Sequence, residues 1–104
     1  MTTDYSREEI NQFTDAVLLE FGAKSCQYCQ SVQGIILSEL FKYPSIRHIQ
    51  IEDGKGHKLG RTFMVKLWPT LIFMRNGLEL KRLVRRFNAQ EIESALMLIN
   101  NKRS

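Results

Sequence analysis

Ala16-Val17-Leu18-Leu19-Glu20-Phe21, followed after four residues by Cys26-Gln27-Tyr28-Cys29, is the most informative pattern in this 104-residue chain. The first segment is an almost unbroken apolar run of strand length, which is typical of a strand buried on both faces of a parallel sheet. A helical pattern begins near Cys29. A buried strand that leads through a C-x-x-C loop into a helix predicts an α/β domain with a dithiol at a helix N-terminus.

The other elements are predicted from hydrophobic spacing and from capping and turn residues. In chain order we expect a helix over 6–13, the strand over 16–21, a helix that ends before Pro44, a strand over 46–52, a short helix over 57–63, strands over 70–74 and 78–84, and a helix from Asn88. Asn76-Gly77 predicts a hairpin between the last two strands, and a slip in the alternation between Arg82 and Leu83 indicates a bulge. This order predicts one small α/β sandwich with a mixed sheet.

Two helices have candidate buried faces. The helix that ends before Pro44 is expected to bury Val32, Ile35, Ile36, Leu40 and Phe41. The helix that starts at Asn88 is expected to bury Ile92, Ala95, Leu96 and Ile99.

Composition places the chain among ordinary globular domains, with 43% hydrophobic and 25% charged residues. No apolar run approaches the roughly 20 residues that a membrane span requires. The N-terminus has no apolar region of the secretory type, so we expect a cytoplasmic protein with no membrane partner. The net charge of +4 is mild. The basic residues over 81–86 are more typical of a solvated strand than of a nucleic-acid surface, so no nucleic-acid partner is expected.

Cys26 and Cys29 are the two cysteines of the chain. A bridge between them closes a very short loop, so a structural staple is a poor explanation, and a redox or metal role is favoured. A helix N-terminus stabilises a thiolate, which predicts Cys26 as the nucleophile and Cys29 as the resolving thiol. Zinc would need His48 and His57 as further ligands, at spacings unlike those of zinc fingers. An inert pair of buried cysteines is the other alternative.

The order strand, C-x-x-C, helix, Trp68-Pro69-Thr70-Leu71-Ile72-Phe73 and Asn76-Gly77 resembles the thioredoxin family over residues 16–100. The resemblance implies a thioredoxin-like fold, a central mixed β-sheet flanked by helices. It also implies a cis bond between Trp68 and Pro69, with Pro69 packed beside the dithiol and the Trp68 backbone available to pair with a substrate peptide. For Trp68, the alternative is an ordinary core aromatic.

Glu20 lies six positions before Cys26, where thioredoxins commonly carry a buried acid. The resemblance implies that Glu20 accepts a proton from the resolving thiol. The alternatives are that its side chain reaches solvent at the strand end or pairs with a base.

Some residues depart from the family pattern Trp-Cys-Gly-Pro-Cys. Gln27 and Tyr28 replace the Gly-Pro pair, and Arg85 stands where the family usually has a glycine close to the dithiol. A guanidinium there would favour the Cys26 thiolate and attract acidic substrates, unless it is simply an arginine of an edge strand in water. Tyr28 before the second cysteine is also a glutaredoxin feature, but no Gly-Gly glutathione-binding segment occurs near Arg85.

These observations predict a thiol–disulfide oxidoreductase that acts mainly as a reductase, with no cofactor and no metal. Catalysis is assigned to Cys26, Cys29 and Glu20, and substrate binding to Trp68, Pro69, Gln27, Tyr28 and Arg85. The expected partners are disulfide-containing proteins and an upstream reductase or glutathione, and a monomer is expected. The alternatives are a glutathione-dependent reductase, or an interaction module with a vestigial dithiol whose basic 81–86 stretch binds an acidic protein or RNA.

Overall fold

The computed structural model describes residues 5–54 and 57–100. The elements in chain order are α1 (Arg7–Asn11), β1 (Ala16–Gly22), α2 (Gln27–Leu40), β2 (Arg47–Glu52), α3 (Leu59–Thr62), β3 (Thr70–Arg75), β4 (Leu78–Val84) and α4 (Ala89–Asn100). Their order and type are those predicted.

The four strands form one mixed sheet in the order β2-β1-β3-β4. β1 is a central strand that pairs in parallel with β2 and antiparallel with β3. All seven residues of β1 are buried, as expected for a strand covered on both faces.

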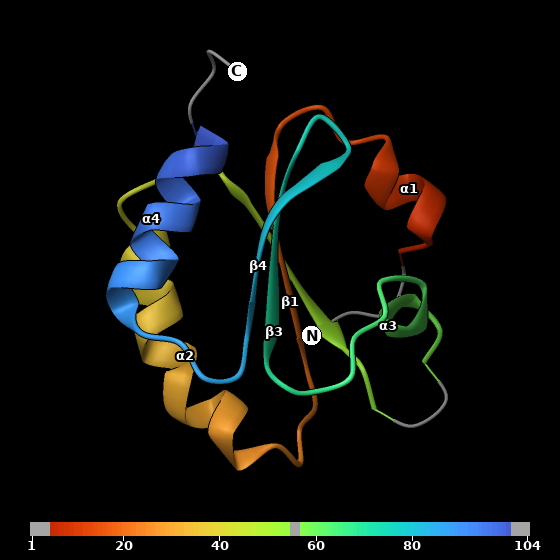
Figure 1. Cartoon of the computed structure of the whole chain (residues 1–104), viewed down its shortest axis with the longest axis vertical. Helices are drawn as coiled ribbons and strands as arrows, with labels where there is room; N and C mark the ends of the chain where they lie inside the picture. The colour runs from red at the N-terminus through yellow and green to blue at the C-terminus, as the bar shows by residue number, and fades with distance from the viewer. Residues whose placement is uncertain (1–4, 55–56, 101–104) are drawn as a thin grey trace.

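Helices cover both faces of the sheet, with α2 and α4 on one face and α1 and α3 on the other (Figure 1). Alternate residues of β1 serve the two sides, since Leu18 joins the core under α2 and α4 while Leu19 joins the core under α1 and α3. The predicted thioredoxin-like architecture is therefore confirmed.

Capping and turn residues act as the sequence predicts. Ser6 and Glu9 form a capping box at the start of α1, and Asn88 and Glu91 exchange the same pair of hydrogen bonds at the start of α4. In the β3–β4 hairpin, Asn76 and Gly77 both have positive φ, the geometry for which Asn-Gly is favoured.

Three predictions of detail are wrong. α2 begins at Gln27, with Cys26 as its N-cap, two residues earlier than expected. Of the expected buried face, only Val32, Ile36 and Leu40 are buried, and Ile35 is 40% exposed. Phe41 is 88% exposed, because α2 ends at the preceding residue, Leu40. The irregularity in β4 lies at Leu80, since Phe73 pairs with Lys81 while Met74 pairs with Glu79. The face predicted for α4 is buried in full.

Candidate functional site

Three loops meet at one end of the sheet, the lower end in Figure 1. Strand register brings them together, because Phe21 of β1 pairs with Thr70 of β3 and Thr70 pairs with Val84 of β4. The loop after β1 therefore lies beside the loop before β3, which lies beside the loop after β4. These loops carry Cys26, Trp68-Pro69 and Arg85, so the fold gathers most of the predicted site residues at one place.

The dithiol sits at the N-terminus of α2. Cys26 and Cys29 are joined as a disulfide, with their Cα atoms 5.3 Å apart. The Cys26 Sγ also accepts a hydrogen bond from the backbone N–H of Cys29 at 3.1 Å. Cys26 is partly exposed, whereas Cys29 is only 3% exposed. The more accessible sulfur is therefore also the one held by a helix N-terminal amide, where a thiolate is stabilised.

Glu20 is a buried carboxylate, only 1% exposed, on the face of β1 that α2 covers. Its Oε1 lies 2.7 Å from the His48 Nε2 on β2 and 3.5 Å from the Gln33 Nε2 on α2. Its Oε2 has no hydrogen-bond partner among the residues that the structure describes. The alternative in which Glu20 reaches solvent is wrong, and the base with which it pairs is His48.

Gln33 is the side chain of α2 that contacts Glu20. The Gln33 side chain lines the same hollow as Cys29, together with residues of the loop after β1, and its amide reaches Glu20. The described partners of Glu20 are therefore His48 and Gln33, neither of which is a cysteine.

Trp68 and Pro69 occupy the loop before β3, and the peptide bond between them is cis, as the resemblance implied. Pro69 is buried and Trp68 is partly exposed. The Trp68 indole Nε1 donates to the Asp53 Oδ2 at 2.8 Å, and the Asp53 backbone N–H donates to the Gly22 carbonyl at 2.7 Å. The Trp68 ring is thus oriented by a carboxylate fixed to the end of β1.

Gly60 explains how Asp53 reaches this position. The Asp53 carboxylate lies where a Cβ on Gly60 would stand, so any larger residue at position 60 would displace it.

Arg85 bridges two of the loops. Its backbone N–H donates to the Pro69 carbonyl at 3.1 Å, and its side-chain Nε–H donates to the Trp68 carbonyl. Its guanidinium carbon lies 5.8 Å from the centroid of the Tyr28 ring, within cation–π range. Arg85 is exposed but engaged, unlike a free arginine of an edge strand. Gln27, the first residue of α2, is exposed beside Cys26.

The zinc alternative finds no support in the geometry. Within residues 5–54 and 57–100, no group of three or more His, Cys, Asp or Glu side chains is arranged to hold a metal ion. His48 is paired with Glu20, and His57 lines a different hollow beside Asp53 and Trp68. Over the same described ranges, no helix is long and apolar enough to cross a membrane.

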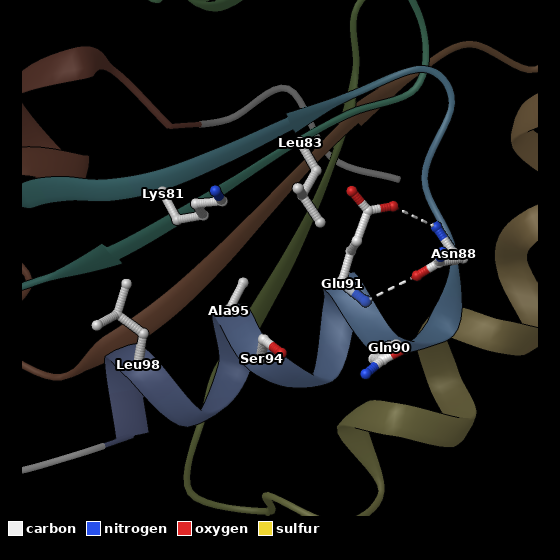
Figure 2. Close-up of a pocket in the computed structure, with 8 residues that line it drawn as sticks. All are labelled: Lys81, Leu83, Asn88, Gln90, Glu91, Ser94, Ala95 and Leu98. Carbon is white, nitrogen blue, oxygen red and sulfur yellow. Dashed lines mark hydrogen bonds between the residues drawn. The ribbon is translucent and has the colours of Figure 1, made fainter.

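A second pocket, of about 470 Å³, lies between β4 and α4 and contains none of the predicted site residues (Figure 2). Figure 2 shows Lys81 and Leu83 from β4 facing the first three turns of α4. Two of its polar residues, Asn88 and Glu91, are hydrogen-bonded to each other as the cap of α4. This pocket is a mostly apolar groove, and its described lining contains no cluster of reactive groups.

Three residues of the site were not predicted in their roles: His48, Gln33 and Asp53. His48 was considered only as a zinc ligand, although it stands two residues after Ile46 and so shares the face of β2 that α2 covers. A histidine on the buried face of a strand beside the strand that carries Glu20 was the available signal.

Comparisons with known proteins agree with this geometry. The family model described as Thioredoxin matches residues 1–97. Thioredoxin H5 from Oryza sativa subsp. japonica is 30% identical over 81 residues, which are 78% of this chain and 60% of that protein. This chain therefore spans less than two-thirds of the length of that curated relative.

Solved structures give the same result. The reduced form of thioredoxin 2 from Pseudomonas aeruginosa PAO1 is 38% identical, with a TM-score of 0.81 over 92% of this chain and 89% of that one. Thioredoxin NaTrxh from Nicotiana alata is 20% identical, with a TM-score of 0.78 over 91% of this chain and 82% of that one, a likeness of fold.

Proposed function

This chain belongs to the thioredoxin family, and we propose that it reduces disulfides of protein substrates with the Cys26–Cys29 pair. A Thioredoxin domain, a bonded cysteine pair and the similar thioredoxin structures support a dithiol–disulfide oxidoreductase. These findings favour neither the glutathione-dependent reductase nor the interaction module. The observation that carries the proposal is the placement of Cys26 as the partly exposed N-cap of α2, with Cys29 buried one turn later.

In the proposed reaction, the Cys26 thiolate attacks one sulfur of a substrate disulfide. A Cys26–substrate disulfide forms, and the other substrate sulfur leaves as a thiolate that takes a proton from solvent. Cys29 then attacks the Cys26 sulfur, which closes the Cys26–Cys29 disulfide and releases the second substrate thiol. Two electrons pass from the protein to the substrate.

The Cys29 thiol must lose its proton before it can attack, and we assign that proton to Glu20. The support is geometric: Glu20 is buried, its Oε1 is occupied by His48 and Gln33, and its Oε2 has no partner among the described residues. A carboxylate oxygen without a partner is suited to accept a proton, and Gln33 links Glu20 to the hollow that Cys29 lines.

We propose that the substrate lies across the loop before β3 and the dithiol turn. The Trp68 backbone pairs with the substrate peptide in β-like fashion, through its N–H and the second lone pair of the carbonyl that already accepts from Arg85, and Pro69 packs beside the sulfurs. Gln27, Tyr28 and Arg85 complete the contact surface. The cross-loop hydrogen bonds of Arg85 and the indole–Asp53 bond support this assignment, because they hold the loop in one shape before substrate arrives.

The remaining assignments are also proposals. We propose re-reduction by an upstream reductase or by glutathione, a cytoplasmic location, and action as a monomer.

Insulin reduction with dithiothreitol as the electron source tests the activity. We expect the protein to accelerate insulin precipitation, and the Cys26→Ser variant to give only the uncatalysed rate. Equal rates with and without the wild-type protein would contradict the proposal and favour an interaction module. The reduction potential of the Cys26–Cys29 pair then tests whether the protein acts as a reductase or as an oxidant. A reductase should have a potential below the cytosolic glutathione potential of roughly −220 to −260 mV, and a value near −120 mV would indicate an oxidant.

A further inference from the structure

Arg85 is held where the loop after β4 meets the loop before β3. Its backbone binds the Pro69 carbonyl and its side chain binds the Trp68 carbonyl. Its guanidinium also lies within cation–π range of Tyr28 in the dithiol turn. One exposed cation therefore spans the loop proposed to hold substrate and the turn that carries both cysteines.

The charge of Arg85 has no carboxylate partner in the part of the chain that the structure describes. The ion pairs found there are Lys42 with Glu39 and Glu93, Arg47 with Asp15, His48 with Glu20, and Arg82 with Glu79. The one side-chain hydrogen bond of Arg85 in these ranges uses Nε. Its two terminal nitrogens thus keep four of the five guanidinium N–H donors for a ligand.

Two acidic side chains at the C-terminal end of β2, Glu52 and Asp53, are hydrogen-bonded within the fold. Asp53 accepts from the Trp68 indole at 2.8 Å, and Glu52 accepts from the backbone N–H of Lys24 at 3.2 Å. Arg86, next to Arg85, is exposed and forms no ion pair within the described residues. Neither Arg85 nor Arg86 is therefore paired with a carboxylate among the described residues, and both side chains are exposed at this end of the sheet.

We propose that Arg85 determines substrate class, so that the protein prefers disulfides flanked by an acidic side chain. This inference rests on the proposed function and names the substrates of that same site. A carboxylate accepts two parallel hydrogen bonds from the terminal nitrogens of a guanidinium, while Nε remains on the Trp68 carbonyl. The acidic residue of the substrate is then fixed between the Trp68 loop and the dithiol turn.

The test uses two disulfide-linked model peptides that differ only in Glu or Gln beside the half-cystine. The measured quantity is the ratio of kcat/KM for the Glu peptide to kcat/KM for the Gln peptide, at low ionic strength with dithiothreitol as reductant. We expect a ratio of about three to five for the wild type, the size that one ion pair at an exposed site gives. Arg85→Gln should bring the ratio close to one, and Arg85→Lys should give an intermediate value because it keeps the charge without the planar fork.

Arg86→Gln is the matched control, since it removes the same charge from the next residue and should keep most of the preference. A wild-type ratio of one, with both peptides reduced, would overturn the role of Arg85 and leave the proposed function intact. An equal fall in the ratio for Arg85→Gln and Arg86→Gln would also overturn it, by assigning the preference to the general field. Failure of the wild type to reduce either peptide or insulin would instead contradict the proposed function.

Discussion

The His48 Nε2 lies 2.7 Å from the Glu20 Oε1, so a buried carboxylate of β1 and an imidazole of β2 share a hydrogen bond on the face of the sheet that α2 covers. The two strands are parallel, with Glu20 opposite Gln50 and Leu18 opposite His48. A buried carboxylate without a partner is costly, and His48 is the close partner that this chain provides.

Removing that partner should destabilise the fold. We expect His48→Ala to lower the free energy of unfolding by about 1–3 kcal/mol, because Glu20 is left with only the distant Gln33 amide. In a Glu20→Gln background the group left behind is neutral, so the same His48 substitution should cost about 1 kcal/mol less. Urea denaturation of the wild type, His48→Ala, Glu20→Gln and the double variant measures the cost of the His48 substitution in both backgrounds. An identical cost in the two backgrounds would show that the pair contributes no coupling energy.

Glu20→Gln should slow the resolving step while leaving the fold intact, because an amide cannot take up the Cys29 proton. At neutral pH we expect a loss on the order of 10²-fold in the rate at which a Cys26 mixed disulfide is resolved. The loss should shrink as the pH rises toward about 8.5, where a free thiol ionises without help. Stopped-flow measurement of thiol release between pH 6 and 9 follows both effects. If Glu20 has only a structural role, the ratio of the wild-type rate to the Glu20→Gln rate should not change over this pH range.

Alanine substitutions at Gly34 and Gly77 are expected to have opposite effects on stability. Gly34 lies inside α2, and a Cβ there meets no atom within 4 Å beyond its chain neighbours and the adjoining helix backbone, so Gly34→Ala should stabilise the protein by about 0.5–1 kcal/mol. Gly77 has a φ of +77°, and its Cβ would strike the backbone carbonyl of Asn11, so Gly77→Ala should destabilise the protein by about 1 kcal/mol or more. Thermal denaturation compares the two. Stabilisation by both would contradict the hairpin geometry.

Local signals were sufficient where one segment alone sets the structure. The bounds of β4 were predicted in full, because Asn76-Gly77 fixes where the hairpin turns. The buried face of α4 was predicted in full, because a capped start at Asn88 sets the phase of the helix. For α2 the start was placed two residues late, and Ile35 and Phe41 were then wrongly assigned to the core.

Contacts between segments could not be predicted in the same way. The sequence pointed to Glu20, but the identity of its base depends on the register between β1 and β2, which no local pattern sets. The bond from Arg85 to the Trp68 carbonyl likewise depends on how the loop before β3 and the loop after β4 meet at the open end of the hairpin. The reactive cysteines could therefore be identified from the sequence. The contacts of Glu20 with His48 and of Arg85 with Trp68 could be identified only from the folded structure.

Trapping of substrate by single-cysteine variants tests the central claim, the division of labour between Cys26 and Cys29, most directly. Cys29→Ser and Cys26→Ser are each incubated with a disulfide-containing protein, and intact mass with peptide mapping locates any mixed disulfide. Cys29→Ser should accumulate substrate on Cys26, which is partly exposed, and Cys26→Ser should accumulate none, because Cys29 is 3% exposed. Equal trapping by the two variants, or trapping on Cys29 alone, would contradict the account.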